Sequence, residues 1–262
     1  MATSRQPKVL FEDGGVLVLA KPAGWLSHAD QGQRSILQWA LRREDADKTS
    51  TADIRLVHRL DQHTSGVMIL AKNPDIAAAL GEMFEQRKIL KSYLALTWPV
   101  PALRWVRVEH RLRPRRIDGG ELMEVVEQGG QEACSEIEVL ARGRRYGLVR
   151  VLPEHGRKHQ VRIALADLAA PIVGDFLYGG RGASKRAKRL MLHARGLELA
   201  HPETGEHLCL YAGVPRDMIE LLEEDGCRFP SHLDRRHRAP KGQRERRRKA
   251  GSSSRSKQRK RR

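Results

Sequence analysis

The stretch LVHRLDQHTSGVMIL, residues 56–70, passes from a polar segment into an apolar run that begins at Val67. An apolar run bounded by turn-forming residues predicts a buried strand. The polar part places Arg59 two residues before Asp61. The simplest interpretation is a turn carboxylate in a surface ion pair with Arg59, which would contribute about 0–1 kcal/mol. A chemical role for Asp61 needs support from other parts of the chain.

Turn and capping signals on either side of this stretch divide the chain into short strands and a few helices. Asp13-Gly14-Gly15 predicts a hairpin turn, Ser35 with Gln38 a capping box, and Asn73-Pro74 the start of a helix. We predict strands over 9–11, 16–20, 67–72, 92–98, 133–140, 148–152, 197–199 and 207–211, and a hairpin-like region over 106–126. Strands grouped in hairpins and interrupted irregularly by helices favour an α+β fold, with a mixed, mainly antiparallel sheet flanked by helices and loops.

The positive charge of the chain is concentrated at one end. The net charge is +17, and residues 235–262 hold 15 Lys and Arg against one acid, Glu245. Such a segment has too little apolar surface to fold and binds polyanions without sequence preference. We therefore expect one folded domain over 1–230 and a basic, disordered tail over 231–262.

Several protein classes are disfavoured by what the sequence lacks. The three cysteines are scattered without a CxxC pair, which argues against a zinc site and a disulfide framework. His155 and His159 have a spacing that would suit a metal, but no third ligand is obvious, so we expect no metal. The N-terminus has no signal-peptide pattern and no apolar run is long enough to span a membrane, so we expect a cytoplasmic protein without membrane contact.

A second polar segment, EHGRKHQVR over 154–162, surrounds one glycine with cations and imidazoles. It precedes the helical spacing of Val161, Leu165 and Leu168. Free N–H groups at a helix start, together with adjacent cations, suit a phosphate. The alternative interpretation is an ordinary solvated helix start.

Five segments of the chain resemble, in the same order, the motifs of RluA-type RNA pseudouridine synthases. They are VLVLAKPAGWLSH (16–28), HRLDQHTSG (58–66), KSYLA (91–95), HGRKHQVRIALADLAAPIVGDFLYGG (155–180) and LMLHARGLELAHPETGE (190–206). The similarity spans residues 9–215, and it leaves no room before Val9 for the S4-type domain of some members. Departures at Ala20, Lys158, 163–164 and 169–170 avoid the expected catalytic positions but obscure the subgroup.

The resemblance implies the pseudouridine synthase fold and the isomerisation of uridine in RNA to pseudouridine, without a cofactor. By position, Asp61 corresponds to the catalytic carboxylate, Arg162 to the basic residue that keeps it ionised, and Tyr93 to a tyrosine that stacks on the uracil. Whether the carboxylate attacks the sugar or abstracts a sugar proton stays open. In either case, a carboxylate can stabilise the positive charge that develops on the glycosidic carbon as its bond to the base breaks.

The resemblance also implies that the target base is extruded from folded RNA, at a cost of a few kcal/mol. We expect Arg59 to fill the vacated space, because its guanidinium can stack and form hydrogen bonds together. His58, Arg157, His159 and Gln160 complete the expected RNA-binding set. We expect a monomer that acts on rRNA or tRNA, with rRNA slightly favoured. A non-catalytic RNA-binding or ribosome-associated protein, and an enzyme acting on free nucleosides, are the alternatives.

Overall fold

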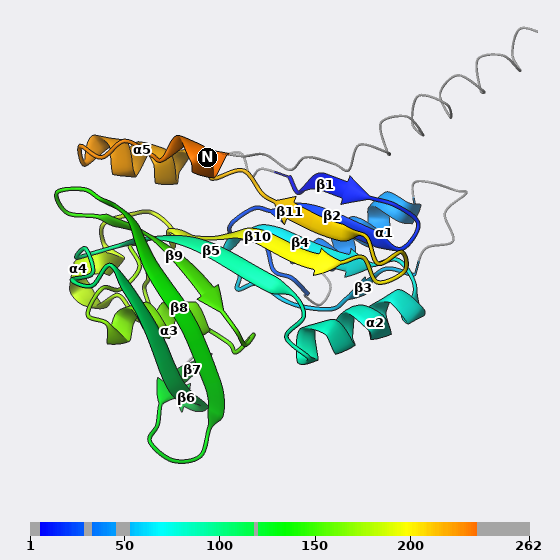
Figure 1. Ribbon diagram of the computed structural model, residues 1–262, viewed down its shortest axis with the longest axis horizontal. Coiled ribbons are helices and arrows are strands. Elements are labelled where there is room, and N and C mark those ends of the chain that lie inside the picture. The colour runs from blue at the N-terminus through cyan, green and yellow to red at the C-terminus, as the bar shows by residue number, and fades with distance from the viewer. Residues whose placement is uncertain (1–5, 29–32, 46–52, 118–119, 235–262) are drawn as a thin grey trace, which may run out of the picture.

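The computed structural model describes residues 6–28, 33–45, 53–117 and 120–234. In these ranges the chain forms an 11-stranded sheet with five α-helices and a 3-10 helix (Figure 1). The strands are β1 (Lys8–Glu12), β2 (Val16–Lys21), β3 (Arg55–Leu56), β4 (Ser65–Ala71), β5 (Leu90–Thr97), β6 (Trp105–Ile117), β7 (Gly120–Val125), β8 (Gln131–Arg142), β9 (Gly147–Pro153), β10 (Leu192–Ala200) and β11 (His207–Tyr211). The helices are α1 (Ile36–Asp45), α2 (Pro74–Glu85), α3 (Gln160–Asp167), α4 (Gly180–Ser184), α5 (Arg216–Glu224) and the 3-10 helix η1 (Ser231–Asp234).

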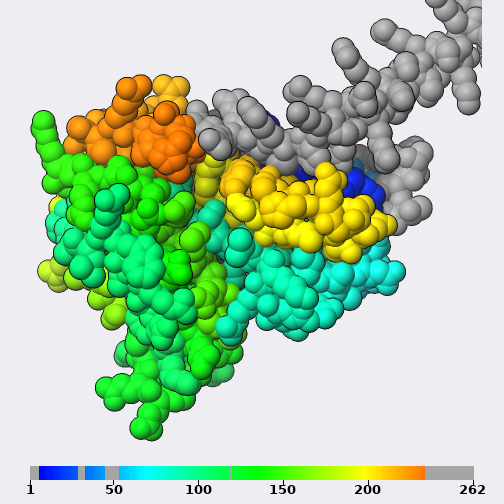
Figure 2. All heavy atoms as spheres, viewed as in Figure 1, coloured from blue at the N-terminus to red at the C-terminus, as the bar shows by residue number. Residues whose placement is uncertain are grey.

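The sheet runs in the order β1-β2-β4-β10-β5-β9-β8-β6-β7, with β3 on β4 and β11 on β10. All of these pairings are antiparallel except β4 with β10. The predicted α+β fold with a mixed, mainly antiparallel sheet is therefore confirmed. In the space-filling view, β6 to β9 form one lobe (green), and α2 with neighbouring segments forms a second (teal to cyan) below β10 and β11 (Figure 2).

The side chains that predicted one turn and two helix starts form the expected hydrogen bonds. The Asp13 carboxylate accepts the backbone N–H groups of the turn between β1 and β2. Asn73 Oδ1 accepts the N–H of Ile76 at 2.8 Å, which caps α2. Ser35 Oγ accepts the N–H of Gln38 at 3.2 Å at the start of α1. Each side chain satisfies a donor that would otherwise lack a partner.

The β4 strand is buried along its whole length, which accounts for its continuous apolar run. Val67 and Ile69 pack into one hydrophobic cluster, and Met68 and Leu70 pack into another on the opposite face. Gly66 has a φ of +129°, and an added Cβ would lie 2.1 Å from the carbonyl oxygen of Ala194. A glycine is thus required where β4 meets β10.

The short helix α4 was not predicted, because its five residues are too few and too glycine-rich to give a helical pattern. Beyond residue 230, Leu233 packs against the core, and its carbonyl accepts a hydrogen bond from Arg195 Nη2 at 2.8 Å. The predicted disordered tail from 235 onward lies outside the described residues. Among the helices described, none has the length and apolarity to cross a bilayer.

Candidate active site

The loop that carries Asp61 is held from beneath by the N-terminal segment. Ser27 Oγ donates to the Leu60 carbonyl at 2.8 Å and accepts the Leu60 N–H at 3.0 Å. The Thr64 N–H donates to the Asp61 carbonyl at 3.1 Å, which closes the turn before β4. The KPAGWLSH segment and the HRLD segment, distant in sequence, are therefore built into one unit.

Lys21 is a second anchor of this loop, and sequence analysis did not assign it a role. Its ammonium is buried and donates to the carbonyls of Trp25 at 2.6 Å and Gln62 at 2.9 Å. Burial lowers the pKa of Lys21 to about 7, although the charge of Asp61 opposes the shift. In the sequence, the only indication of this role was the position of Lys21 directly before a proline in the AKPAG segment.

Asp61 lies beside Arg162, but Arg162 is bound more closely by another carboxylate. Arg162 Nη1 is 3.5 Å from Asp61 Oδ2, whereas Nε and Nη2 donate to Asp175 at 2.8 and 2.7 Å. Both Arg162 and Asp175 are buried, and Asp61 is about a quarter exposed. A bidentate pair fixes the guanidinium plane. Arg162 is therefore positioned by Asp175 and offers its remaining nitrogen to Asp61, which stays open to the pocket.

His159 approaches the same oxygen of Asp61 as Arg162 does, and it is in contact with the Tyr178 hydroxyl. His159 Nε2 is 3.8 Å from Asp61 Oδ2, and Nδ1 is 2.8 Å from the Tyr178 hydroxyl. That hydroxyl already accepts the N–H of Met123 in β7 at 2.9 Å, so its own hydrogen points to Nδ1. The neutral ring then carries its hydrogen on Nε2, toward Asp61. Burial lowers the pKa of His159, in keeping with a neutral ring.

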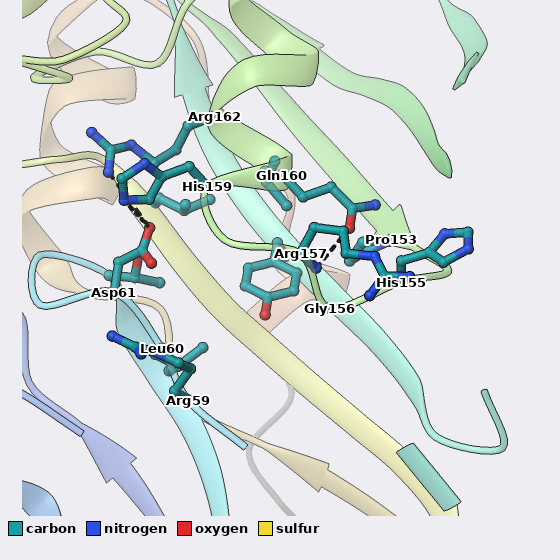
Figure 3. Close-up of a pocket in the computed structure, with 14 residues that line it drawn as sticks. Arg59, Leu60, Asp61, Pro153, His155, Gly156, Arg157, His159, Gln160 and Arg162 are labelled. Carbon is teal, nitrogen blue, oxygen red and sulfur yellow. Dashed lines mark hydrogen bonds and ion pairs between the residues drawn. The ribbon is translucent and has the colours of Figure 1, made fainter. Parts of the chain in front are cut away.

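The pocket itself is small, with a cavity volume of about 70 Å³ (Figure 3). Asp61, Arg162 and His159 line one end of it (Figure 3). Tyr93 from β5 also lines the pocket. Burial, together with the charge of Asp61, raises the pKa of Tyr93 above its ordinary value. Tyr93 is therefore a protonated phenol at neutral pH, which suits stacking and hydrogen bonding better than proton abstraction.

Arg59 and Arg157 also line the pocket, and their side chains have few contacts with the protein. Arg59 is exposed, and within the described chain it forms no hydrogen bond or ion pair, so it is not the partner of Asp61. Arg157 Nε donates to the Glu132 carbonyl at 3.0 Å, and its N–H is accepted by Gln160 Oε1. Both guanidinium charges lack a carboxylate partner among the described residues.

Two of the residues expected to contact RNA are instead used inside the protein. His58 Nε2 accepts the Ile69 N–H at 3.0 Å, its ring stacks on Phe84 at 4.9 Å, and it does not line the pocket. Gln160 is buried, and its amide donates to the Cys134 carbonyl and Ser135 Oγ. Their placement supports a structural role, because hydrogen bonds within the fold already occupy these groups.

The spacing of His155 and His159 does not bring the two rings to one metal-binding point. His155 Nδ1 accepts the Cys134 N–H at 3.1 Å, while His159 bonds Tyr178. A different group of potential ligands lies on the paired strands β10 and β11, where Cys209 Sγ is 3.6 Å from His207 Nδ1 and Glu198 is adjacent. His207 and Cys209 are two residues apart on β11, and Glu198 reaches them from β10, a proximity that the sequence does not reveal.

Comparison with known proteins agrees with this fold. The family model described as RNA pseudouridylate synthase matches residues 15–167. The tRNA pseudouridine synthase C of Salmonella typhi is 32% identical, over 84% of this chain and 90% of that protein. The ribosomal large subunit pseudouridine synthase D of Xanthomonas campestris pv. campestris is 36% identical, over 84% of this chain and 70% of that protein. The solved structure of human RNA Pseudouridylate Synthase Domain Containing 4 superposes with a TM-score of 0.72 at 29% identity, over 85% of this chain and 94% of that one.

The fold and the similarity over most of the chain define an isomerase that forms pseudouridine in RNA. The chain belongs to the RNA pseudouridylate synthase family, and the predicted RluA-type resemblance is confirmed. Asp175 and Tyr178 were not assigned by sequence analysis, although both lie in the quoted GDFLYGG segment.

Proposed function

We propose that this protein converts uridine in structured rRNA to pseudouridine, with Asp61 as the carboxylate that acts on the sugar of the target nucleotide. The observation that carries this proposal is the placement of Asp61 in the pocket, 3.5 Å from Arg162 and 3.8 Å from His159. Both neighbours stabilise a carboxylate charge while leaving one side of it open. Since one chain supplies the whole site, we propose that the protein acts as a monomer.

The reaction needs no external group. The bond from C1′ to N1 breaks, the uracil rotates, C5 bonds to C1′, and the hydrogen on C5 is lost while N1 gains one. Positive charge on C1′ in the first step is offset by the Asp61 carboxylate, whether it attacks or removes a sugar proton. Tyr93 stacks on the released uracil and holds it during rotation, and Arg59 occupies the space left in the RNA.

The choice of rRNA rests on the charge distribution. The body of the chain is nearly neutral, and the 15 Lys and Arg of residues 235–262 favour a large polyanion. The relatives include a protein named for tRNA and one named for the large ribosomal subunit. Transfer RNA is therefore the competing substrate in the experiment.

The test is tritium release from RNA labelled at uridine C5, with unmodified rRNA and tRNA transcripts offered separately to the full chain. We expect release from rRNA, and a loss of at least about 1,000-fold for Asp61→Asn with RNA binding retained. Release from tRNA alone would overturn the rRNA assignment. Substantial activity of Asp61→Asn would overturn the role of Asp61, and no release from either RNA would favour a non-catalytic RNA-binding protein.

A further inference from the structure

Four basic side chains gather beside the pocket from two separate segments. Arg87 and Lys91 come from the end of α2 and the start of β5, and His155 and Arg157 come from the loop between β9 and α3. Lys91 Nζ donates to the carbonyls of Glu154 at 3.3 Å and His155 at 3.0 Å, which joins the two segments. We refer to these four residues as the basic cluster.

The members of the basic cluster repel one another. Burial, with the charges of Arg87 and Arg157, lowers the pKa of Lys91 to about 8. Burial and the same two charges also lower the pKa of His155. The adjacent carboxylate of Glu154 raises the pKa of His155, but this carboxylate is itself bound by Arg107. Arg87, Lys91 and Arg157 have no carboxylate partner among the described residues, so an anion placed between them would relieve this repulsion.

The backbone at Arg87 favours a glycine. Arg87 has a φ of +59° just after α2, and the Lys88 N–H donates to the Met83 carbonyl at 2.9 Å. This left-handed position after a helix is usually occupied by glycine, because a Cβ is unfavourable there. An arginine at this point is not explained by local structure, and its exposed side chain has no partner in the described chain.

His155 provides a second, independent indication. Its ring is more than nine-tenths buried, and Nδ1 accepts the Cys134 N–H, so its hydrogen is on Nε2. Nε2 is buried and has no hydrogen-bond partner among the described residues. Buried donors are nearly always satisfied, so Nε2 is a donor available to a water or to a ligand oxygen.

The basic cluster lies where two cavities meet. The small cavity holds Asp61, and a larger one of about 940 Å³ is lined by Arg87 and Lys91. Tyr93 and Pro153 line both. If the base of a nucleotide enters the small cavity, the sugar–phosphate chain attached to it passes this junction.

We propose that Arg87, Lys91, His155 and Arg157 bind a backbone phosphate of the RNA strand adjoining the target uridine. This inference rests on the proposed function, because it takes the substrate to be RNA with its target base beside Asp61. It assigns to Arg87 and Lys91 a role that the motifs did not indicate, and it explains the arginine at a position that favours glycine.

The test is the affinity of the full chain for fluorescent rRNA and tRNA transcripts at several salt concentrations, for Arg87→Gly and Lys91→Gln. Lys88→Gln is the matched control, because it removes one exposed charge from the same turn. We expect each cluster variant to bind about tenfold more weakly, with the slope of log affinity against log salt reduced by about 0.7–0.9. Arg87→Gly should unfold at a temperature no lower than wild type, which separates binding from folding.

Equal affinities for Arg87→Gly and Lys88→Gln would overturn the phosphate site. This readout does not depend on turnover, so it remains decisive if tritium release fails. In turnover assays the cluster variants should raise KM far more than they lower kcat. A loss confined to kcat would show that the basic cluster acts on the site and not on the RNA.

Discussion

Arg162 and Arg59 line the same pocket, yet one is fixed and the other is free. Arg162 is buried, bonds Asp175 through two nitrogens, and lies at 5.0 Å from the Tyr178 ring. Arg59 is exposed and has no partner within the described chain. Under the proposed function, Arg162 holds the carboxylate of Asp61 and benefits from a fixed plane, whereas Arg59 follows the RNA and benefits from freedom. We call the buried group of Arg162, Asp175 and Tyr178 the floor of the pocket, because its charges are matched within the protein. We call the exposed Arg59 part of the rim, because its charge has no partner in the described chain.

Replacing Arg162 should give the largest effect. Arg162→Met leaves the buried Asp175 without its cation, which costs about 3–5 kcal/mol of unfolding free energy. It also removes the positive charge beside Asp61, so most of the turnover should be lost. Urea unfolding and tritium release measure the two effects, with Arg162→Lys as the control that keeps the charge but not the fork geometry. A wild-type rate in Arg162→Met would contradict the assignment of the floor.

Replacing Arg59 should affect RNA without affecting the fold. Arg59→Met is expected to change the unfolding free energy by less than about 0.5 kcal/mol, because the side chain is exposed and unpaired. The value of kcat/KM for RNA should fall about 10- to 100-fold, the range for losing a stacked contact. If Arg59→Met were destabilised as strongly as Arg162→Met, the division between floor and rim would be wrong.

Replacing Tyr178 tests whether its hydroxyl fixes which nitrogen of His159 carries the hydrogen. Tyr178→Phe removes the hydroxyl that orients His159 and leaves the Met123 N–H unpaired, at a cost of about 1–3 kcal/mol. We expect kcat to fall about tenfold. Nitrogen-15 spectra of the imidazoles should report hydrogen on Nε2 of His159 in the wild type and a mixture in the variant. An unchanged tautomer in Tyr178→Phe would assign the orientation of His159 to another contact.

The last prediction concerns the dependence of stability on pH. Burial, with the charge of Lys91, lowers the pKa of His58 to about 4, against 6.5 for an ordinary histidine. Between these values the unfolded chain binds the proton and the folded chain does not. Stability therefore rises with pH across this window and is lost as pH falls from 6.5 toward 4, by up to about 1.4 kcal/mol per pH unit.

His58→Gln keeps an acceptor for the Ile69 N–H but cannot titrate. Its unfolding free energy should depend less on pH between 6.5 and 4 than that of the wild type, while Arg59→Met should retain the wild-type dependence. Identical slopes for His58→Gln and wild type would show that the protonation of His58 is not linked to folding.

The parts of the fold that local chemistry determines were predictable. The turn at Asp13, the cap at Asn73 and the buried run of β4 follow from side chains acting on their own neighbourhoods. The strand bounds differ by a few residues, and α4 was missed because it is short. The place of β10 between β4 and β5 was not predictable, since it depends on pairing across distant segments.

The site shows the same limit. Asp61 and Arg162 could be expected together from motif order, but the closer partner of Arg162, Asp175, could not. His58 could have a structural or an RNA-positioning role from its motif alone, and its hydrogen bond to the Ile69 N–H supports the structural one. A motif indicates which residues matter, whereas the burial and hydrogen-bond partners of each residue decide what it does.

The parallel pairing of β10 with β4 has a consequence for synthesis of the chain. β10 occupies the middle of the sheet, between β4 and β5, yet its residues Leu192–Ala200 are translated after nine other strands. Until it inserts, Gly66 has no partner and the edges of β4 and β5 stay open. Contacts between such distant segments form slowly. We therefore expect the loop that carries Asp61 to reach its final form only late in synthesis, after β10 has been translated.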